Sequence, residues 1–262
     1  MGTTDIPAAE EKGPTARTTV TSFRVIEALK ERGTAGVSEL ADELDLAKGT
    51  IHKHLNTLRR LDYVIKDGHA YRLSVSFLGL GTSARACLPI AETVVEPLED
   101  LASTTEETVG LMIPEHGHGI YILRESAQKQ MEMAAREGDR LPMHATAGGK
   151  AILSYTPPEE RERILDYRGL PKLTDNTITD RDALEDELQL TRDRRMAYDR
   201  SEYREGWHCI AHPVTNSDGR AIGAITVSGP AARMKEKDAS TYFASIIGST
   251  ANSVQNAFAL DR

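Results

Sequence analysis

The sequence lacks both a cysteine framework and any long apolar segment. Its 262 residues include only two cysteines, Cys87 and Cys209, which are too few for a disulfide framework and too far apart for a CxxC metal or redox pair. No stretch approaches the roughly 18 consecutive apolar residues of a membrane helix. The first residues also lack the basic-then-apolar order of a secretory signal. These absences predict a cytoplasmic protein with no membrane partner.

Positive charge is also scarce, but it is unevenly distributed. The chain has 32 Lys and Arg against 40 Asp and Glu, and its net charge of −8 disfavours nucleic acid as a partner. Residues 48–72, however, contain six basic and two acidic residues, whereas residues 81–262 contain 21 basic and 29 acidic residues. The sequence therefore has one basic segment in an otherwise acidic chain.

The N-terminal segment predicts a polar tail followed by a first helix. Residues 1–19 are rich in threonine, which indicates a disordered tail. Phe23, Ile26 and Leu29 then recur at three-residue spacing, which predicts an amphipathic helix that ends at Gly33. With this length and 39% hydrophobic residues, the chain is expected to form two globular domains.

Two further helices and a hairpin complete the pattern of the first domain. A short helix with Ser38 as its N-cap is followed, after a tight break, by a third helix from Lys48 to about Leu61. Two alternating strands joined by Asp67-Gly68 come next. Helix, short helix, turn, helix and hairpin in this order predict a winged helix-turn-helix domain.

The third helix presents a basic face that is suited to DNA. Ile51, Leu55 and Leu58 form its apolar stripe, so the opposite side chains point outward. The outward face has no carboxylate before Asp62, and basic or amide side chains in the major groove can contact phosphate oxygens or base edges. The predicted DNA-contacting residues are Lys48, Thr50, His52, Lys53, Asn56 and Arg60 on this helix, with Lys66, His69 and Arg72 on the hairpin.

A second domain of the α+β class is predicted after a helical linker. Residues 77–104 have a mostly helical pattern, and hairpin patterns follow at 107–126 and 209–230, with helices between and after them. The apolar residues of the linker need a partner surface, which predicts a homodimer, or dimers paired into a homotetramer. These residues are Leu78, Leu80, Ile90, Val94, Val95 and Leu98.

From about Val20 to its C-terminus, the chain resembles the IclR-type transcriptional regulators. SELADELDLAKGTIHKHLNTLRRLDYV is similar to the helix-turn-helix of that family. RLPMHATAGGKAILSYTPPEE and AYDRSEYREGWHCIAHPVTNSDGRAIGAITVSGPAAR are similar to its effector-domain signatures. The chain departs from the family at Gly49, where Ser is usual, at Lys53, where Arg is common, and at His54, where an apolar residue is usual.

The resemblance implies a winged helix, a linker helix that helps to dimerise, and a GAF-like C-terminal domain with an antiparallel sheet. Such a domain binds a small molecule, often an organic acid, and no cofactor is expected. The domains implied are a tail at 1–19, the winged helix-turn-helix at 20–76, a linker at 77–104 and the effector-binding and oligomerisation domain at 105–262.

The effector pocket that the resemblance implies uses six positions. They are the backbone amides near Ala147 and Gly148 and the side chains of Asp199, Cys209, Thr226 and Ser228. Strand geometry supports two of them, because Thr226 and Ser228 share a face with Ile222 and their hydroxyls can converge. The helix expected after His144 supplies amides and a dipole that favour a carboxylate.

Two other classes of protein fit parts of the sequence. The candidates for a thiol–base pair or a metal cluster are His144, His208, Cys209 and His212, and Cys209 is also the candidate for a thiol- or metal-sensing regulator. In a strand, however, His208 and His212 point to one side and Cys209 to the other. No GxSxG, P-loop, HExxH or GxGxxG motif is present, so neither a hydrolytic enzyme nor a metal site is expected.

The sequence as a whole therefore predicts a DNA-binding transcriptional regulator, either a repressor or an activator. One recognition helix reads only a few base pairs, so two copies are expected on a palindromic operator of double-stranded DNA. A small organic acid bound in the C-terminal domain is expected to modulate the affinity for this operator.

Overall fold

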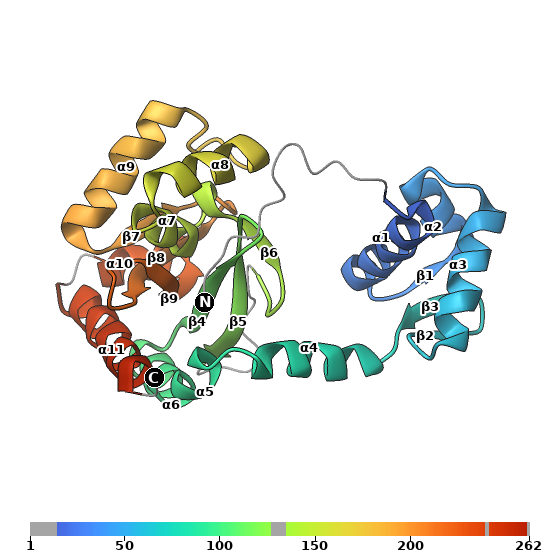
Figure 1. The fold of residues 1–262 in the computed structure, drawn as a ribbon, viewed down its shortest axis with the longest axis horizontal. Helices are drawn as coiled ribbons and strands as arrows, with labels where there is room; N and C mark the ends of the chain where they lie inside the picture. The colour runs from blue at the N-terminus through green and yellow to red at the C-terminus, as the bar shows by residue number, and fades with distance from the viewer. Residues whose placement is uncertain (1–14, 127–134, 239–240, 261–262) are drawn as a thin grey trace. The chain divides into compact units, whose positions relative to one another are not determined.

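The computed structural model describes residues 15–126, 135–238 and 241–260, and it divides into two compact units. One unit ends at Cys87 and the other continues from Leu88 (Figure 1). The division falls inside the predicted linker, so residues 77–87 belong to the first unit and residues 88–104 to the second. Within the described residues, no helix combines the length and the apolar character needed to cross a bilayer.

The first unit has the order of elements of a winged helix-turn-helix. Its elements are α1 (Arg17–Arg32), β1 (Ala35–Gly36), α2 (Val37–Leu44), α3 (Lys48–Arg60), β2 (Val64–Asp67), β3 (Ala70–Leu73) and α4 (Ser76–Ala86). The strands form an antiparallel sheet in the order β1-β3-β2, with the β2–β3 hairpin as the wing. The predicted fold of the N-terminal domain is thus confirmed.

Helix α1 starts earlier than predicted and buries a different face. It begins at Arg17, so the end of the predicted tail is helical. Val25, Ala28 and Leu29 are buried, whereas Phe23 is 58% exposed. Phe23 lies two positions before Val25, about 200° away around the helix, and therefore on the opposite side. The predicted place of Phe23 in the apolar stripe is wrong.

Helix α2 is capped by a different residue from the one predicted. It begins at Val37, with Gly36 rather than Ser38 at the N-cap position. The N–H of Gly36 donates to Oε2 of Glu39 over 2.6 Å, so a carboxylate in the first turn satisfies the backbone at this end. The predicted tight break after α2 is confirmed, because Asp45 takes a left-handed conformation with φ of 51°.

The loop of the wing also differs by one residue from the prediction. Asp67 pairs with Ala70 across the hairpin, so the two loop residues are Gly68 and His69. Gly68 has a φ of 58°, a left-handed conformation that glycine adopts without a steric penalty. His69, one of the predicted DNA-contacting residues, therefore lies in the loop itself.

The second unit is an α+β domain built on one antiparallel sheet. Its strands are β4 (Thr108–Glu115), β5 (His118–Ser126), β6 (Arg140–Pro142), β7 (Ala197–Arg200), β8 (Trp207–Thr215) and β9 (Ala221–Pro230). Its helices are α5 (Ile90–Thr93), α6 (Val95–Thr105), η1 (Met143–Ala145), α7 (Ala147–Ser154), α8 (Pro158–Arg168), α9 (Arg181–Arg194), α10 (Ala231–Asp238) and α11 (Thr241–Leu260). The strand order is β6-β5-β4-β9-β8-β7, which confirms the predicted class.

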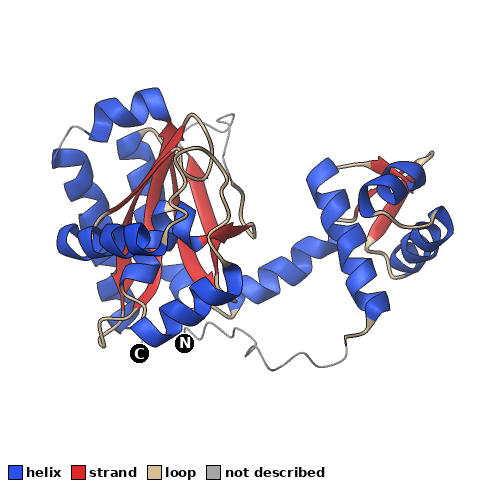
Figure 2. Cartoon of the chain, turned by 90° about the horizontal axis from the view of Figure 1, so that it is seen from above, coloured by secondary structure: helices blue, strands red, loops and turns tan. Residues whose placement is uncertain are grey.

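Helices cover both faces of this sheet (Figure 2). Helices α6 and α11 pack on one face, where alternate residues such as Val109 and Val227 are buried. Helix α7 packs on the other face, where Met112, Ala211 and Ala224 are buried. Each central strand therefore has two buried sides, and any polar side chain on the α7 face is enclosed by the fold.

A β-bulge near the start of β9 interrupts its alternation. Val214 pairs with Gly223. Thr215 pairs with Ala221, which leaves Ile222 as the extra residue. Ile222 packs against the α6–α11 side. Its predicted position on the same face as Thr226 and Ser228 is therefore wrong, although those two hydroxyls do share a face.

The apolar residues of the predicted linker have two different environments. Ile90, Val94 and Leu98 are at most 5% exposed and belong to the core of the second unit. Leu78 and Leu80 on α4 are 72% and 54% exposed. The prediction that these apolar residues need a partner surface is wrong for the buried ones, because α5 and α6 pack against their own domain.

Candidate DNA-binding face and effector site

Helix α3 exposes the basic face that its periodicity predicts. Ile51, Leu55 and Leu58 are buried in the core of the first unit. Of the predicted contact residues, Lys48, His52, Lys53, Arg60, Lys66, His69 and Arg72 are exposed, and Thr50 and Asn56 are half-buried. All nine are therefore placed on α3 or the wing with their polar groups outside the core.

Neighbouring side chains order parts of this face. His52 Nδ1 and Asn56 Nδ2 lie 3.0 Å apart, one helical turn from each other. On the wing, Lys66 Nζ lies 5.7 Å from the centre of the Tyr71 ring, at the distance of a cation–π contact. These contacts limit the rotamers of groups that would otherwise be free in solvent, and so preorganise the face.

The unusual histidine on α3 has a structural explanation. His54 is half-buried, and its Nδ1 lies 2.9 Å from the Ser22 hydroxyl on α1. A polar link between α1 and α3 thus stands where IclR-type sequences usually have an apolar residue. His54 supports the position of α3 and is not part of the exposed face.

The four predicted effector-binding side chains converge on the α7 face of the sheet. Asp199 on β7 pairs with Cys209 on β8, and Cys209 pairs with Ser228 on β9. Thr226 lies two residues along β9 on the same face, with its hydroxyl donating to the Gly110 carbonyl over 3.3 Å. All four residues are buried. Side chains from three adjacent strands thus form one polar cluster.

The start of α7 lies against this cluster. A Cβ atom added to Gly148 would be 3.0 Å from Thr226 Cγ2 and 2.7 Å from Met112 Sδ, so the helix approaches the sheet closely here. Thr146 caps the helix by accepting the N–H of Gly149 over 3.2 Å. The first amides of a helix have no intrahelical partner, so those of Ala147 and Gly148 are not used by α7 itself.

Asp199 is held by the backbone and is easily protonated. Its Oδ1 accepts the N–H of Glu202 over 2.7 Å and the N–H of Tyr203 over 3.3 Å. Burial nevertheless raises the pKa of Asp199 to about 7, and the neighbouring Glu202 carboxylate adds to the increase. Near neutral pH this side chain can therefore be a neutral hydrogen-bond donor.

Cys209 has the properties of a packed thiol. Burial raises its pKa to about 12, with a further contribution from Asp199, so the reactive thiolate is disfavoured. His212 lies on the opposite face of the sheet, where Gly248 of α11 approaches its ring. Among the described residues, no group of three His, Cys, Asp or Glu is placed to hold a metal ion.

Arg124 on β5 was not predicted, and it enters the same cluster. Its strand position is opposite Gly110, and the Tyr121 ring lies over that glycine, 3.1 Å from the place that a Cβ of Gly110 would take. Nη2 donates to Ser228 Oγ over 3.0 Å, and Nη1 donates to the Ala135 carbonyl over 3.0 Å. The guanidinium centre lies 4.2 Å from the centre of the Tyr121 ring.

The positive charge of Arg124 is not neutralised by a carboxylate of the described residues. Arg124 is 8% exposed, and among the described residues its side chain makes only the two hydrogen bonds to neutral groups and its Nε has no partner. A buried charge without a counter-charge is unfavourable unless a ligand supplies one. The signal in the sequence was that the single arginine Arg124 directly follows the uncharged run GIYIL.

A β-bulge in β5 places Tyr121 and Arg124 on the same face of the sheet, which the alternation of residues in the sequence does not predict. Leu111 pairs with Leu123, but Met112 pairs with Tyr121, so Ile122 is the extra residue. The bulge turns Tyr121 to the α7 face, where it packs in the same core cluster as Met112. Strict alternation along β5 places Tyr121 on the opposite face from Arg124.

Lys150 is a second charged residue that the sequence did not reveal. It is fully buried on α7, and its Nζ lies 2.7 Å from Glu202 Oε1 and 3.3 Å from Glu187 Oε1. Glu202 in turn donates its backbone N–H to Asp199. Lys150 therefore supports the Asp199 end of the cluster through Glu202.

A winged helix with an exposed basic helix, together with an α+β domain that encloses a polar cluster, is the architecture of a two-domain DNA-binding regulator. Residues 21–68 match the IclR helix-turn-helix domain, and residues 83–256 match the family described as bacterial transcriptional regulator IclR C-terminal. The chain belongs to the IclR family of DNA-binding transcriptional regulators.

Individual relatives agree with this assignment. The regulator KdgR of Dickeya chrysanthemi is 30% identical over 224 residues, which cover 85% of this chain and 73% of KdgR. The repressor AllR of Escherichia coli is 29% identical over 212 residues, which cover 79% of this chain and 77% of AllR. These relatives are transcriptional regulators.

A solved structure has the same fold. It is an IclR homologue from Microbacterium hydrocarbonoxydans in complex with 4-hydroxybenzoate, with a TM-score of 0.75 and 22% identity, and the match covers 91% of this chain and 98% of that one. At this identity the likeness supports the fold alone.

Proposed function

We propose that a small organic acid binds in the cluster around Arg124 and changes the affinity of the regulator for its DNA operator. The unneutralised guanidinium of Arg124 is the observation that carries this proposal, because a carboxylate supplies the missing counter-charge. The proposed ligand-binding residues are Ala147 and Gly148 through their amides, and Arg124, Asp199, Cys209, Thr226 and Ser228 through their side chains.

Asp199 favours an acid that also carries a hydroxyl or keto group. An ionised Asp199 would repel the carboxylate of the ligand, but a pKa of about 7 allows the protonated form at neutral pH. In that form the side chain donates a hydrogen bond to a ligand oxygen. The 4-hydroxybenzoate bound to the homologue from Microbacterium hydrocarbonoxydans is an acid with a hydroxyl group, and so belongs to the class of ligand proposed here.

The DNA-binding part of the proposal requires two copies of α3. One basic helix covers only a few base pairs, so a dimer on a two-fold symmetric site lengthens the sequence that is read. The exposed residues Val75, Leu78 and Leu80 supply an apolar surface on and beside α4 for this association.

The association is tested by light scattering of the purified protein. We expect the mass of a dimer or a tetramer at micromolar concentration, and a lower mass for the Leu78→Glu, Leu80→Glu double variant. A monomer mass for the unmodified protein would exclude dimerisation through this surface.

The effector proposal is tested by a thermal-shift screen over hydroxy and keto acids, followed by calorimetry and DNA gel shifts with the best acid. Arg124→Gln is expected to weaken binding of the acid by on the order of a hundredfold, because a buried charge-assisted contact is lost. Arg140→Gln, which removes an exposed arginine on β6, serves as the matched control. Equal affinity in the two variants would place the ligand elsewhere, and binding without a change in DNA affinity would mean that the acid is not the effector.

A further inference from the structure

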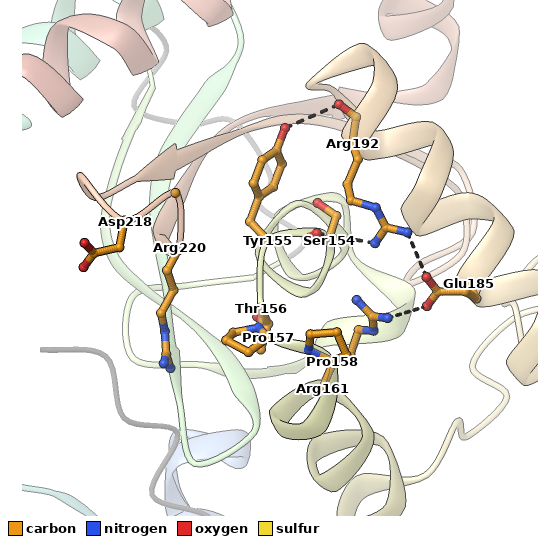
Figure 3. A pocket seen from close by; sticks show the side chains of 11 residues that line it. Ser154, Tyr155, Thr156, Pro157, Pro158, Arg161, Glu185, Arg192, Asp218 and Arg220 are labelled. Carbon is orange, nitrogen blue, oxygen red and sulfur yellow. Dashed lines mark hydrogen bonds and ion pairs between the residues drawn. The ribbon is translucent and has the colours of Figure 1, made fainter.

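Polar groups that already satisfy one another have no capacity left for a partner. Such a network surrounds the hollow at the C-terminal end of α7, where Glu185 accepts from both Arg161 Nη2 and Arg192 Nη2 over 2.8 Å (Figure 3). Arg192 donates further to the Gln189 side chain and to the Ser154 carbonyl. The opposite situation occurs on the exposed face of α3, where one side-chain amide keeps a donor and an acceptor unused.

This amide belongs to Asn56 and is held from one side by a histidine. Asn56 is half-buried, and His52, one helical turn earlier, is exposed. Asn56 Nδ2 lies 3.0 Å from His52 Nδ1. An amide nitrogen has only donors, so His52 Nδ1 is the acceptor and the ring proton is on Nε2. The contact uses one of the two N–H groups of the amide.

The remaining polar groups of the amide match a single base. Among the described residues, the other N–H and the Oδ1 of Asn56 have no hydrogen-bond partner. The amide therefore presents one donor beside one acceptor. In the major groove adenine presents an acceptor at N7 beside a donor at N6, whereas guanine presents two acceptors, and cytosine and thymine present one polar group each. Adenine is the base that can use both groups of Asn56.

The surroundings of Asn56 on α3 suit a contact with a base. Lys53 precedes it by three residues and Arg60 follows it by four, so two exposed cations lie beside it on the same face of the helix. Gly49 lies two turns before Asn56, and no atom of the described residues is within 4 Å of the place that its Cβ would take. Neither packing nor a positive φ explains this glycine. The missing side chain lets α3 approach the base edges closely.

We propose that Asn56 binds N6 and N7 of an adenine in each half-site of the operator, and that His52 is a positioning residue that fixes the orientation of the amide. Lys53 and Arg60 contact phosphates, which hold the helix in register but carry no sequence information. A fixed amide loses less freedom on binding than a rotating one, which can offer its donor and acceptor in either order. This inference rests on the proposed function, because it requires that α3 binds the operator.

Selection of bound duplexes from a random pool by the full-length protein tests the proposal, followed by gel shifts with the selected site and its single-position variants. We expect a two-fold symmetric site with an A·T pair at one position of each half-site, and a loss of roughly ten- to hundredfold when another pair replaces it. Asn56→Ala should remove the preference at this position alone and leave the salt slope unchanged.

Lys53→Ala is the matched control on the same face of α3. It should weaken binding to every sequence and reduce the salt slope by about one, with the same preferred bases. Preferred bases that are unchanged in Asn56→Ala, or the loss of a preference for a pair other than A·T, would overturn the assignment of adenine. A protein that selects no sequence at all would overturn the proposed operator as well, so the two failures are distinguishable.

Two variants of His52 separate positioning from a direct contact. His52→Ala should lower the preference for A·T at the Asn56 position severalfold. His52→Gln should restore it, because the Gln side-chain oxygen can accept from the Asn56 amide one turn along the helix. Circular dichroism confirms that each variant is folded. A preference that is lost equally in both variants, or retained in both, would overturn the positioning role of His52.

Discussion

The two units keep the positive charges to which we assign proposed functions in opposite environments. In the winged helix domain Lys53 and Arg60 are exposed, whereas in the second unit Arg124 and Lys150 are 8% and 0% exposed. DNA presents its phosphates to a surface, so charges that meet it stay hydrated until the complex forms. A small ligand replaces water inside the fold, so its partners are buried and positioned before it arrives.

Because of this difference, removing a positive charge is expected to lower stability in the second unit but not in the winged helix domain. An exposed lysine has water as an alternative partner, and its removal changes stability little. A buried lysine neutralises carboxylates that have no other counter-charge, so its removal leaves them unpaired. Variants that remove one charge from each environment test the comparison directly.

The largest effect is expected for Lys150→Met. The change leaves Glu202 buried without its partner at 2.7 Å, and we expect a loss of about 3–5 kcal/mol in the free energy of unfolding. Urea denaturation followed by the fluorescence of Trp207, the only tryptophan, reports on the second unit. Lys172→Met, which breaks an exposed pair with Asp175, is the control and should cost less than about 1 kcal/mol. Equal losses in the two variants would contradict the comparison.

The second effect is a pH dependence of stability that originates at Asp199. Its folded pKa of about 7 lies above its ordinary value of 3.8, so the protonated side chain favours the folded state below about pH 4. That contribution is lost as the pH rises through 7, at up to about 1.4 kcal/mol per pH unit. The titratable groups around Asp199 are Glu202 and Lys150, whose side chains remain in their positions, and Cys209, whose thiol stays neutral.

Asp199→Asn should therefore flatten this dependence. The amide oxygen can still accept the backbone N–H groups of Glu202 and Tyr203, but the side chain no longer titrates. Relative to the unmodified protein, the variant should gain stability between pH 5 and pH 8, as measured by urea denaturation at several pH values. Parallel pH curves for the two proteins would show that Asp199 titrates normally.

The third effect concerns only the exposed charges. Lys53→Ala and Arg60→Ala should each weaken operator binding by about tenfold and reduce the salt slope by about one, with little change in stability. Gel shifts against fragments of the upstream region at several salt concentrations measure this. Arg32→Ala, which breaks a surface pair with Glu43 outside the predicted face, is the control. Affinity that is unchanged in both variants and independent of salt would remove α3 from the interface.

The sequence predicted the first unit well because its function depends on local periodicity. The apolar spacing of Ile51, Leu55 and Leu58 fixes which side of α3 is exposed, and no distant contact changes that. The errors in this unit lie at helix ends and faces. Gly36 rather than Ser38 caps α2, because Glu39 reaches back to the backbone from inside the helix.

The second unit could be predicted only in part, because its site depends on contacts between strands. Asp199, Cys209, Thr226 and Ser228 were found through family resemblance, and the structure places them together. Arg124 could not be found in this way. Its proposed role depends on the register of β4 with β5, the packing of Tyr121 over Gly110 and a bulge, and none of these leaves a periodic signal.

The smallest effect tests the interior of the effector site. Ser228→Ala removes the hydroxyl that accepts a hydrogen bond from Arg124 Nη2 and, in the proposed complex, also faces the acid. The expected loss is on the order of 1 kcal/mol in the binding of the acid, the usual value of one neutral hydrogen bond. Because Ser228 does not face DNA, operator affinity without the acid should stay unchanged, unlike in Lys53→Ala. Calorimetry with the best acid measures the loss, with Ser249→Ala at an exposed serine of α11 as the control. Unchanged affinity in Ser228→Ala and also in Cys209→Ala would move the acid away from this wall, and Arg124 would then need another counter-charge.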